Sequence, residues 1–183
     1  MKKAIATLII FFLALVIMST HSQVTAQSEV STPSSVTISS YIAIGLSNDL
    51  ANGIEFGNLV PGTNDNPAFD NDKGEGGGTS MWVEVSPESN VGVDLCIKDN
   101  QPLTSNGNQI PNEGYTWSDN RDPMLPNLPG TPISTTYRKT NEIALAPGER
   151  DYFRFWLDVP TAQPPGTYTN LVYFKAVETG LPC

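Results

Sequence analysis

The chain of 183 residues contains a single histidine, His21. This histidine lies in an N-terminal segment that we expect to be removed from the mature protein. Without histidine, Ser-His-Asp and Cys-His nucleophilic systems and histidine-ligated zinc sites are excluded. The absence therefore favours a protein that is not an enzyme.

Basic residues are also scarce, with 10 Lys and Arg against 19 Asp and Glu and a formal net charge of −9. Removal of residues 1–26 would take away Lys2 and Lys3 and no acidic residue, which changes the formal net charge from −9 to −11. An acidic surface repels phosphate backbones and anionic lipids. We expect no nucleic-acid partner, and no membrane binding once the signal is cleaved.

Only one long hydrophobic run is present, from Ala4 to Met18 behind two lysines. It is shorter than the roughly 20 residues of a membrane-spanning helix, and small residues follow it up to Ala26. This order is typical of a secretory signal peptide. We therefore predict a signal peptide over residues 1–26 and a protein that is secreted, extracellular or on the cell surface. The alternative is a type IV pilin-like leader, cut after Lys3 or Ala4, whose apolar helix is retained.

The chain has two cysteines, Cys96 and Cys183. In a secreted protein, an even pair of cysteines indicates one internal disulfide. The bond would tie the C-terminus to a strand in the middle of the chain. The alternative is an intermolecular bond or a lipid attached at Cys183.

What the sequence does contain is a recurrent period of two, the signature of β-strands. In the stretch 149–177, Phe153 and Phe155 alternate with polar or amphipathic residues, a Pro- and Gly-rich connection follows, and Val172 and Phe174 continue the alternation. We expect these two runs to form neighbouring strands, with the four apolar side chains in the core.

A second pair of strands is expected from MWVEVSPES and VGVDLCIKD, which a short polar turn separates. About seven such strands are present after the signal, and no convincing amphipathic helix. We predict an all-β fold in which residues 27–183 form a single β-sandwich, of jelly-roll or immunoglobulin-like type, preceded by an N-terminal signal helix. Residues 100–132, rich in Asn, Pro and Gly, are predicted to form a long loop.

An acidic, glycine-rich stretch is the only metal-site candidate. Calcium binds six to eight oxygens of carboxylates, amides and carbonyls. The candidate ligands are Asp65, Asp70, Asp72 and Glu75. Because the spacing departs from that of a calcium loop, the alternative is a solvated acidic loop. No other cofactor is indicated.

Other carboxylates and aromatic residues carry weaker hypotheses. Glycoside hydrolysis uses two facing carboxylates, and the pairs Asp151 with Asp158 or Glu84 with Asp94 are candidates, although outward carboxylates are usually surface charge. An aromatic platform for sugar rings is a further hypothesis, set against ordinary packing. Its members would be Trp82, Trp117, Trp156, Tyr152 and Tyr173.

The run SVTISSYIAIGL, residues 35–46, is expected to be a strand about 40 Å long at roughly 3.3 Å per residue. That length is large for a compact sandwich, so the strand either bends to serve two sheets or extends beyond its own domain. An extended strand can complete the sheet of a neighbouring molecule. The alternative is an ordinary first strand.

Three segments together resemble the TasA/camelysin-like secreted β-sandwich proteins and the related archaeal bundling pilins. They are SVTISSYIAIGL, GIEFGNLVPGT with its Gly-Asn-x-x-Pro-Gly turn, and FRFWLDVPTAQPPGTYTNLVYFKAV. The resemblance implies a jelly-roll-like fold and assembly by donor-strand exchange, with residues 27–46 as the donor strand. The donor side chains would be Val36, Ile38, Ile42 and Ile44.

We therefore predict a secreted structural subunit of an extracellular filament or biofilm matrix, a homopolymer joined by strand exchange. The alternative is a monomeric carbohydrate-binding or adhesion module on the cell surface.

Overall fold

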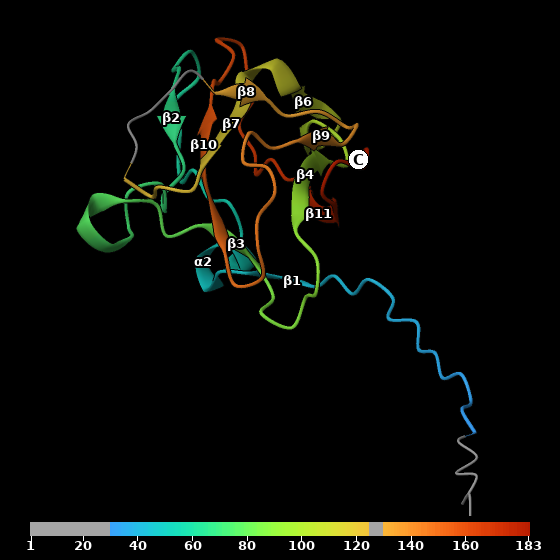
Figure 1. Cartoon of the computed structure of the whole chain (residues 1–183). Coiled ribbons are helices and arrows are strands. Elements are labelled where there is room, and N and C mark those ends of the chain that lie inside the picture. The colour runs from blue at the N-terminus through green and yellow to red at the C-terminus, as the bar shows by residue number, and fades with distance from the viewer. Residues whose placement is uncertain (1–29, 125–129) are drawn as a thin grey trace, which may run out of the picture. The chain divides into compact units, whose positions relative to one another are not determined.

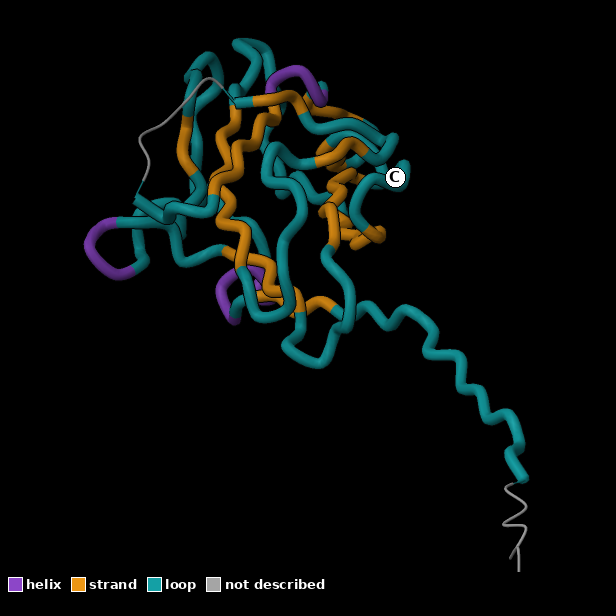
Figure 2. The backbone as a smooth tube through the Cα atoms, viewed as in Figure 1, coloured by secondary structure: helices purple, strands orange, loops and turns teal. Residues whose placement is uncertain are grey.

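The computed structural model describes residues 30–124 and 130–183. In these residues β-strands in antiparallel sheets dominate, and the only α-helix is the short α2 (Asn48–Asn52). Two single 3₁₀ turns, η1 (Glu75–Gly77) and η2 (Asn112–Gly114), complete the helical content, as Figure 2 shows. The all-β prediction is confirmed. The predicted signal peptide lies outside the described residues.

The larger sheet has six strands, all paired antiparallel. Its main order is β1-β3-β10-β7-β8, and β2 pairs with the far end of β10. Their bounds are β1 (Ile44–Leu46), β2 (Asn66–Pro67), β3 (Trp82–Val85), β7 (Tyr115–Asn120), β8 (Thr131–Pro132) and β10 (Arg150–Leu157). The long strand β10 is central because it pairs with β3, β2 and β7 (Figure 1).

The smaller sheet has three strands in the order β11-β4-β9. They are β4 (Val93–Asp99), β9 (Arg138–Lys139) and β11 (Val172–Glu178). A separate hairpin consists of β5 (Leu103–Ser105) and β6 (Asn108–Ile110). Its turn residues Asn106 and Gly107 both have positive φ, which the tight turn requires.

The core lies between the two larger sheets. Val83, Phe153 and Phe155 enter it from the six-stranded sheet, and Leu95 enters it from the three-stranded sheet. The Phe153 and Phe174 rings meet edge to face across the core with centroids 5.0 Å apart. The alternation of apolar side chains therefore correctly predicted which face of each strand is buried.

The predicted partners of these strands were wrong in two cases. Strand β10 pairs with β3 and β7, and β11 pairs with β4, so the two runs in 149–177 belong to different sheets. Likewise β3 and β4 face each other across the core instead of sharing hydrogen bonds. A period of two fixes the face of a side chain, while the neighbouring strand depends on contacts distant in sequence.

The stretch 100–132 is more regular than the predicted loop. It contains the β5–β6 hairpin and also β7, which lies between β10 and β8 in the six-stranded sheet. Tyr115 and Trp117 of β7 are almost fully buried. Polar residues at alternate positions of β7 masked this strand in the sequence.

The disulfide between Cys96 and Cys183 is confirmed, with a sequence separation of 87 residues. Cys96 projects from β4 on the side opposite Leu95 and Ile97, and it lies in register with Lys175 of β11 and Lys139 of β9. The bond therefore fixes the C-terminal residue to the outer side of the three-stranded sheet.

Candidate functional site

The N-terminal segment that the sequence singles out has little regular structure. Residues 30–43 form no strand or helix, and the strand expected over residues 35–46 is limited to β1. Val36 is 84% exposed and Ile38 is 81% exposed. Exposed β-branched residues at alternate positions favour an extended backbone, which a second strand would stabilise.

The chain joins the compact unit, residues 39–183, at Ser39. From Ser39 onward it is held by Asn90 in the turn after β3. Asn90 Nδ2 donates to the Ser39 carbonyl at 3.0 Å, the Tyr41 backbone amide donates to Asn90 Oδ1 at 2.7 Å, and the Asn90 backbone amide donates to the Tyr41 carbonyl at 3.1 Å. Ile42 and Ile44 are partly buried against the core. The four predicted donor residues therefore divide into two exposed ones, Val36 and Ile38, and two that belong to the chain's own core.

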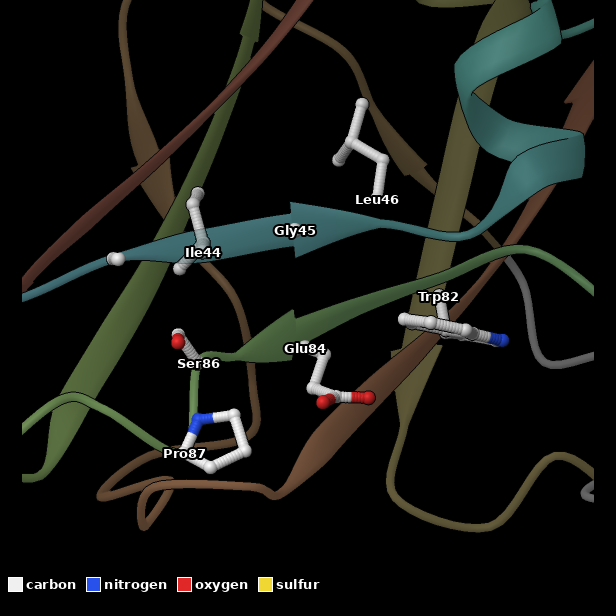
Figure 3. A pocket seen from close by; sticks show the side chains of 8 residues that line it. Ile44, Gly45, Leu46, Trp82, Glu84, Ser86 and Pro87 are labelled. Carbon is white, nitrogen blue, oxygen red and sulfur yellow. The ribbon is translucent and has the colours of Figure 1, made fainter.

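Strand β1 forms one edge of the six-stranded sheet and borders a shallow hollow of about 320 Å³. Figure 3 shows Trp82, Glu84 and Pro87 lining it beside β1. The Arg150 guanidinium lies 4.0 Å from the Trp82 ring centre, and its Nε donates to Glu84 Oε2 at 2.7 Å. One face of Trp82 is therefore already covered by this cation.

Strand β11 forms an edge of the three-stranded sheet. The Asn100 amide donates to the Leu171 carbonyl, and the Thr179 amide donates to the Gly92 carbonyl. The odd-numbered residues of β11 therefore direct their backbone groups toward β4. Backbone groups alternate in direction along an antiparallel strand. The N–H and C=O groups of Val172, Phe174 and Ala176 therefore point away from β4.

The side chains of these three residues point to the core but are only partly buried. If another strand lay beside β11, these side chains would be buried more completely, because each would have an apolar neighbour on both sides. The β11 edge thus combines unpaired backbone groups with incompletely covered apolar side chains. A further strand added there would satisfy both.

The four predicted calcium ligands are not gathered into one site. In residues 30–124 and 130–183, no group of three or more acidic, His or Cys side chains could hold a metal ion. The Asp65 amide instead donates a hydrogen bond to Asp158 Oδ1 at 2.7 Å. Asp72 lies 3.8 Å from Arg154 Nε, and Glu75 is exposed at the start of η1. Burial and the nearby Asp49 and Glu55 raise the pKa of Asp70. Calcium binding stays a prediction without an assembled site.

Neither carboxylate pair proposed for glycoside hydrolysis faces a common cleft. Asp151 is fully buried near the start of β10, and Asp158 follows its far end. Glu84 is paired with Arg150 in the six-stranded sheet, and Asp94 is paired with Lys139 at 2.7 Å in the three-stranded sheet. Although burial opposes ionisation, hydrogen bonds from Lys139 and two backbone amides keep the pKa of Asp94 below its ordinary value.

The proposed aromatic platform does not form. Trp117 and Trp156 are buried, Tyr152 and the partly covered Trp82 lie in the six-stranded sheet, and Tyr173 lies in the other sheet. These side chains therefore present no shared flat surface to a sugar chain.

Sequence reasoning missed a pair of buried carboxyls inside the sheet. Asp119 and Asp151 project inward from the adjacent strands β7 and β10. Asp119 accepts hydrogen bonds from the backbone and side chain of Asn141 and from the Glu142 amide. Neither oxygen of Asp151 has a hydrogen-bond partner among the described residues. If the pairing of β7 with β10 had been known, the register would have shown that both carboxyls point inward.

Comparisons with known proteins give no relatives: no family model, curated protein or solved structure matches this chain. In the described part of the chain, no helix is both long and apolar enough to cross a membrane.

Proposed function

We propose that this protein is a secreted, non-enzymatic structural subunit that forms an extracellular filament or matrix by donating its N-terminal segment to a neighbouring copy. The observation that carries the proposal is the exposure of Val36 and Ile38 in a segment without secondary structure. Alternating β-branched residues left in water gain stability when they enter another sheet.

The β11 edge supports the proposal as the receiving surface. It offers outward backbone groups at Val172, Phe174 and Ala176, together with partly covered apolar side chains. Backbone hydrogen bonds would give the added strand affinity, and alternate side chains would set its register. Since the donor segment and the receiving edge are different surfaces, the contact is heterologous and can repeat without closure.

Fold and location fit this proposal. Two antiparallel sheets around one core support a β-sandwich, for which we infer a jelly-roll or immunoglobulin-like type. The disulfide supports folding in an oxidising compartment, and the N-terminal pattern supports secretion.

Electron microscopy of the purified secreted protein tests the proposal, together with a variant that lacks residues 27–38. This deletion leaves the hydrogen bonds of Tyr41 and all of β1 in place. We expect filaments from the full chain, and monomers with an unchanged melting temperature from the variant. Filaments from the shortened chain, or only monomers of the full chain at every concentration, would contradict the proposal.

A further inference from the structure

The outer side of the three-stranded sheet carries an unusual group of lysines and tyrosines. Lys98 Nζ lies 4.8 Å from the ring centre of Tyr137 and 5.5 Å from that of Tyr173, and Lys175 Nζ lies 5.5 Å from Tyr137. Tyr173 and Lys175 are exposed, and Lys98 and Tyr137 are partly exposed. We call these four residues the tyrosine–lysine patch.

Positive charge is concentrated on this sheet. Between residues 27 and 97 the sequence has ten acidic residues and one basic residue, Lys73, whereas residues 98–183 hold seven basic and nine acidic residues. The three-stranded sheet carries four of those seven, Lys98, Arg138, Lys139 and Lys175. Lys139 is neutralised by Asp94. Among the residues that the structure describes, Lys98 and Lys175 pair with no acidic side chain, and Lys175 Nζ donates to the Cys183 carbonyl at 2.7 Å. The patch is therefore a local positive region on an acidic protein.

A second surface has the opposite character and an apolar centre. Phe69 is 65% exposed, and its amide donates to the Glu55 carbonyl at 2.7 Å. Lys73 Nζ lies 4.4 Å from the Phe69 ring centre, so one basic group lies among the carboxylates of this surface. Asp70 follows it and lies close enough to Asp49 and Glu55 to feel their charge. With the exposed Glu75 of η1, these residues form what we call the acidic face: Asp49, Glu55, Phe69, Asp70 and Glu75.

The two surfaces lie on different sheets of the same compact unit. The acidic face lies on segments before and after β2, which pairs with the six-stranded sheet. The patch lies on β4, β11 and the chain before β9. In Figure 1, β2 and the turn of η1 lie on the left, while β9, β11 and the C-terminus lie on the right. One copy therefore cannot bring its own two surfaces together.

We propose that the tyrosine–lysine patch of one copy binds the acidic face of a second copy. Carboxylates meet the ammonium groups of Lys98 and Lys175, and the exposed ring of Phe69 packs on Tyr137 or Tyr173. The contact is heterologous, so each bound copy leaves one patch and one acidic face free. This contact would add to strand exchange in the proposed filament, but the contact does not require strand exchange.

Sedimentation velocity at pH 7.5 tests this contact in the full secreted chain carrying Val36→Asp and Ile38→Asp, which suppress the proposed strand exchange. Because strand exchange is suppressed in this variant, failure of the patch contact is distinguished from failure of strand exchange. We expect oligomers that grow with concentration at about 20 mM salt and dissociate at about 500 mM, where screening shortens the range of charge attraction.

Charge reversal identifies the two surfaces. K98E/K175E and D70K/E75K should each abolish self-association, whereas an equimolar mixture of the two variants should associate again, because the reversed patch meets the reversed acidic face. F69A should weaken association by roughly tenfold. E88K/E113K, which reverses two exposed carboxylates elsewhere, changes the net charge as D70K/E75K does and should leave association intact.

Circular dichroism and the intact disulfide confirm that each variant folds. If K98E/K175E does not fold, K98Q/K175Q replaces it in the test for loss of self-association. Absence of salt-sensitive oligomers in the parent chain overturns the proposal, as does equal association of all variants. Binding of polygalacturonate that requires Lys98 and Lys175, without self-association, would also overturn it and assign the patch to an acidic polysaccharide.

Discussion

Among the individual residues, Asp151 has the least favourable surroundings. Its side chain is fully buried in β10, and neither carboxyl oxygen has a hydrogen-bond partner in the part of the chain that the structure describes. Burial, together with the nearby Asp119 and Glu142, raises the pKa of Asp151 to about 8. Burial also raises the pKa of Asp119, despite its three hydrogen bonds. At neutral pH the folded protein therefore holds a proton on Asp151 that the unfolded chain has released.

The sign of the pH dependence follows from this proton. The folded state binds more protons than the unfolded state between about pH 4 and pH 8, so stability falls as the pH rises through that range. The slope from one such group is at most about 1.4 kcal/mol per pH unit. We expect D151N to flatten the profile and to be more stable than the wild type at pH 8, because a neutral amide replaces the protonated acid.

Urea unfolding of both proteins at several pH values measures this difference. E88Q, which removes the charge of an exposed carboxylate, is the matched control and should keep the wild-type profile. Parallel profiles for D151N and the wild type would show that Asp151 does not titrate as described.

At the scale of elements, the side of β10 that pairs with β3 and β2 is completed by side chains where neither strand reaches. Strand β3 pairs with this side up to Tyr152, and β2 pairs with it from Trp156. Between them, Thr79 Oγ1 donates to the Phe153 carbonyl at 2.7 Å, and Asn71 Nδ2 donates to the Phe155 carbonyl at 2.8 Å. Asn71 Oδ1 also accepts the Phe155 amide at 2.9 Å.

We therefore expect N71A to lower the free energy of unfolding by about 2–3 kcal/mol, since it leaves a buried amide without its partner. The Phe155 carbonyl keeps its bond from the Ala68 amide, which limits the loss. Urea denaturation measures the change, with N108A in the exposed β5–β6 hairpin as the control. A loss no larger than that of N108A would show that Asn71 does not hold this side of β10.

The same side of β10 illustrates which features the sequence pattern could predict and which it could not. Alternation predicted that Phe153 and Phe155 are buried, because a strand with one apolar face must turn it to the core. It could not predict Asn71, because a buried asparagine in a loop has no periodic signal. Nor could it reveal that β10 and β11 belong to different sheets, which depends on packing between distant segments.

At the scale of the whole molecule, the proposed assembly depends on surfaces whose residues come together only in the folded chain. The sequence predicts that Val36 and Ile38 are donor residues, and their exposure is what the proposed strand exchange requires. The β11 edge, which we propose as the receiving surface, and the tyrosine–lysine patch could not be predicted, because each depends on strands that are distant in sequence. If the donor segment and the β11 edge act as proposed, they are separate surfaces, which suits open assembly.

Exchange of the two exposed donor residues for charged ones tests this view of the molecule. V36D/I38D should abolish filaments, because a buried unpaired carboxylate is strongly unfavourable in the receiving core. The melting temperature should stay unchanged, since both side chains are exposed in the single chain. S35D/T37D adds the same charge at the alternate positions, which would face outward in the added strand, and should retain filaments. Electron microscopy compares the two variants, and equal loss or equal retention of filaments would show that the apolar side chains of Val36 and Ile38 are not the determinant.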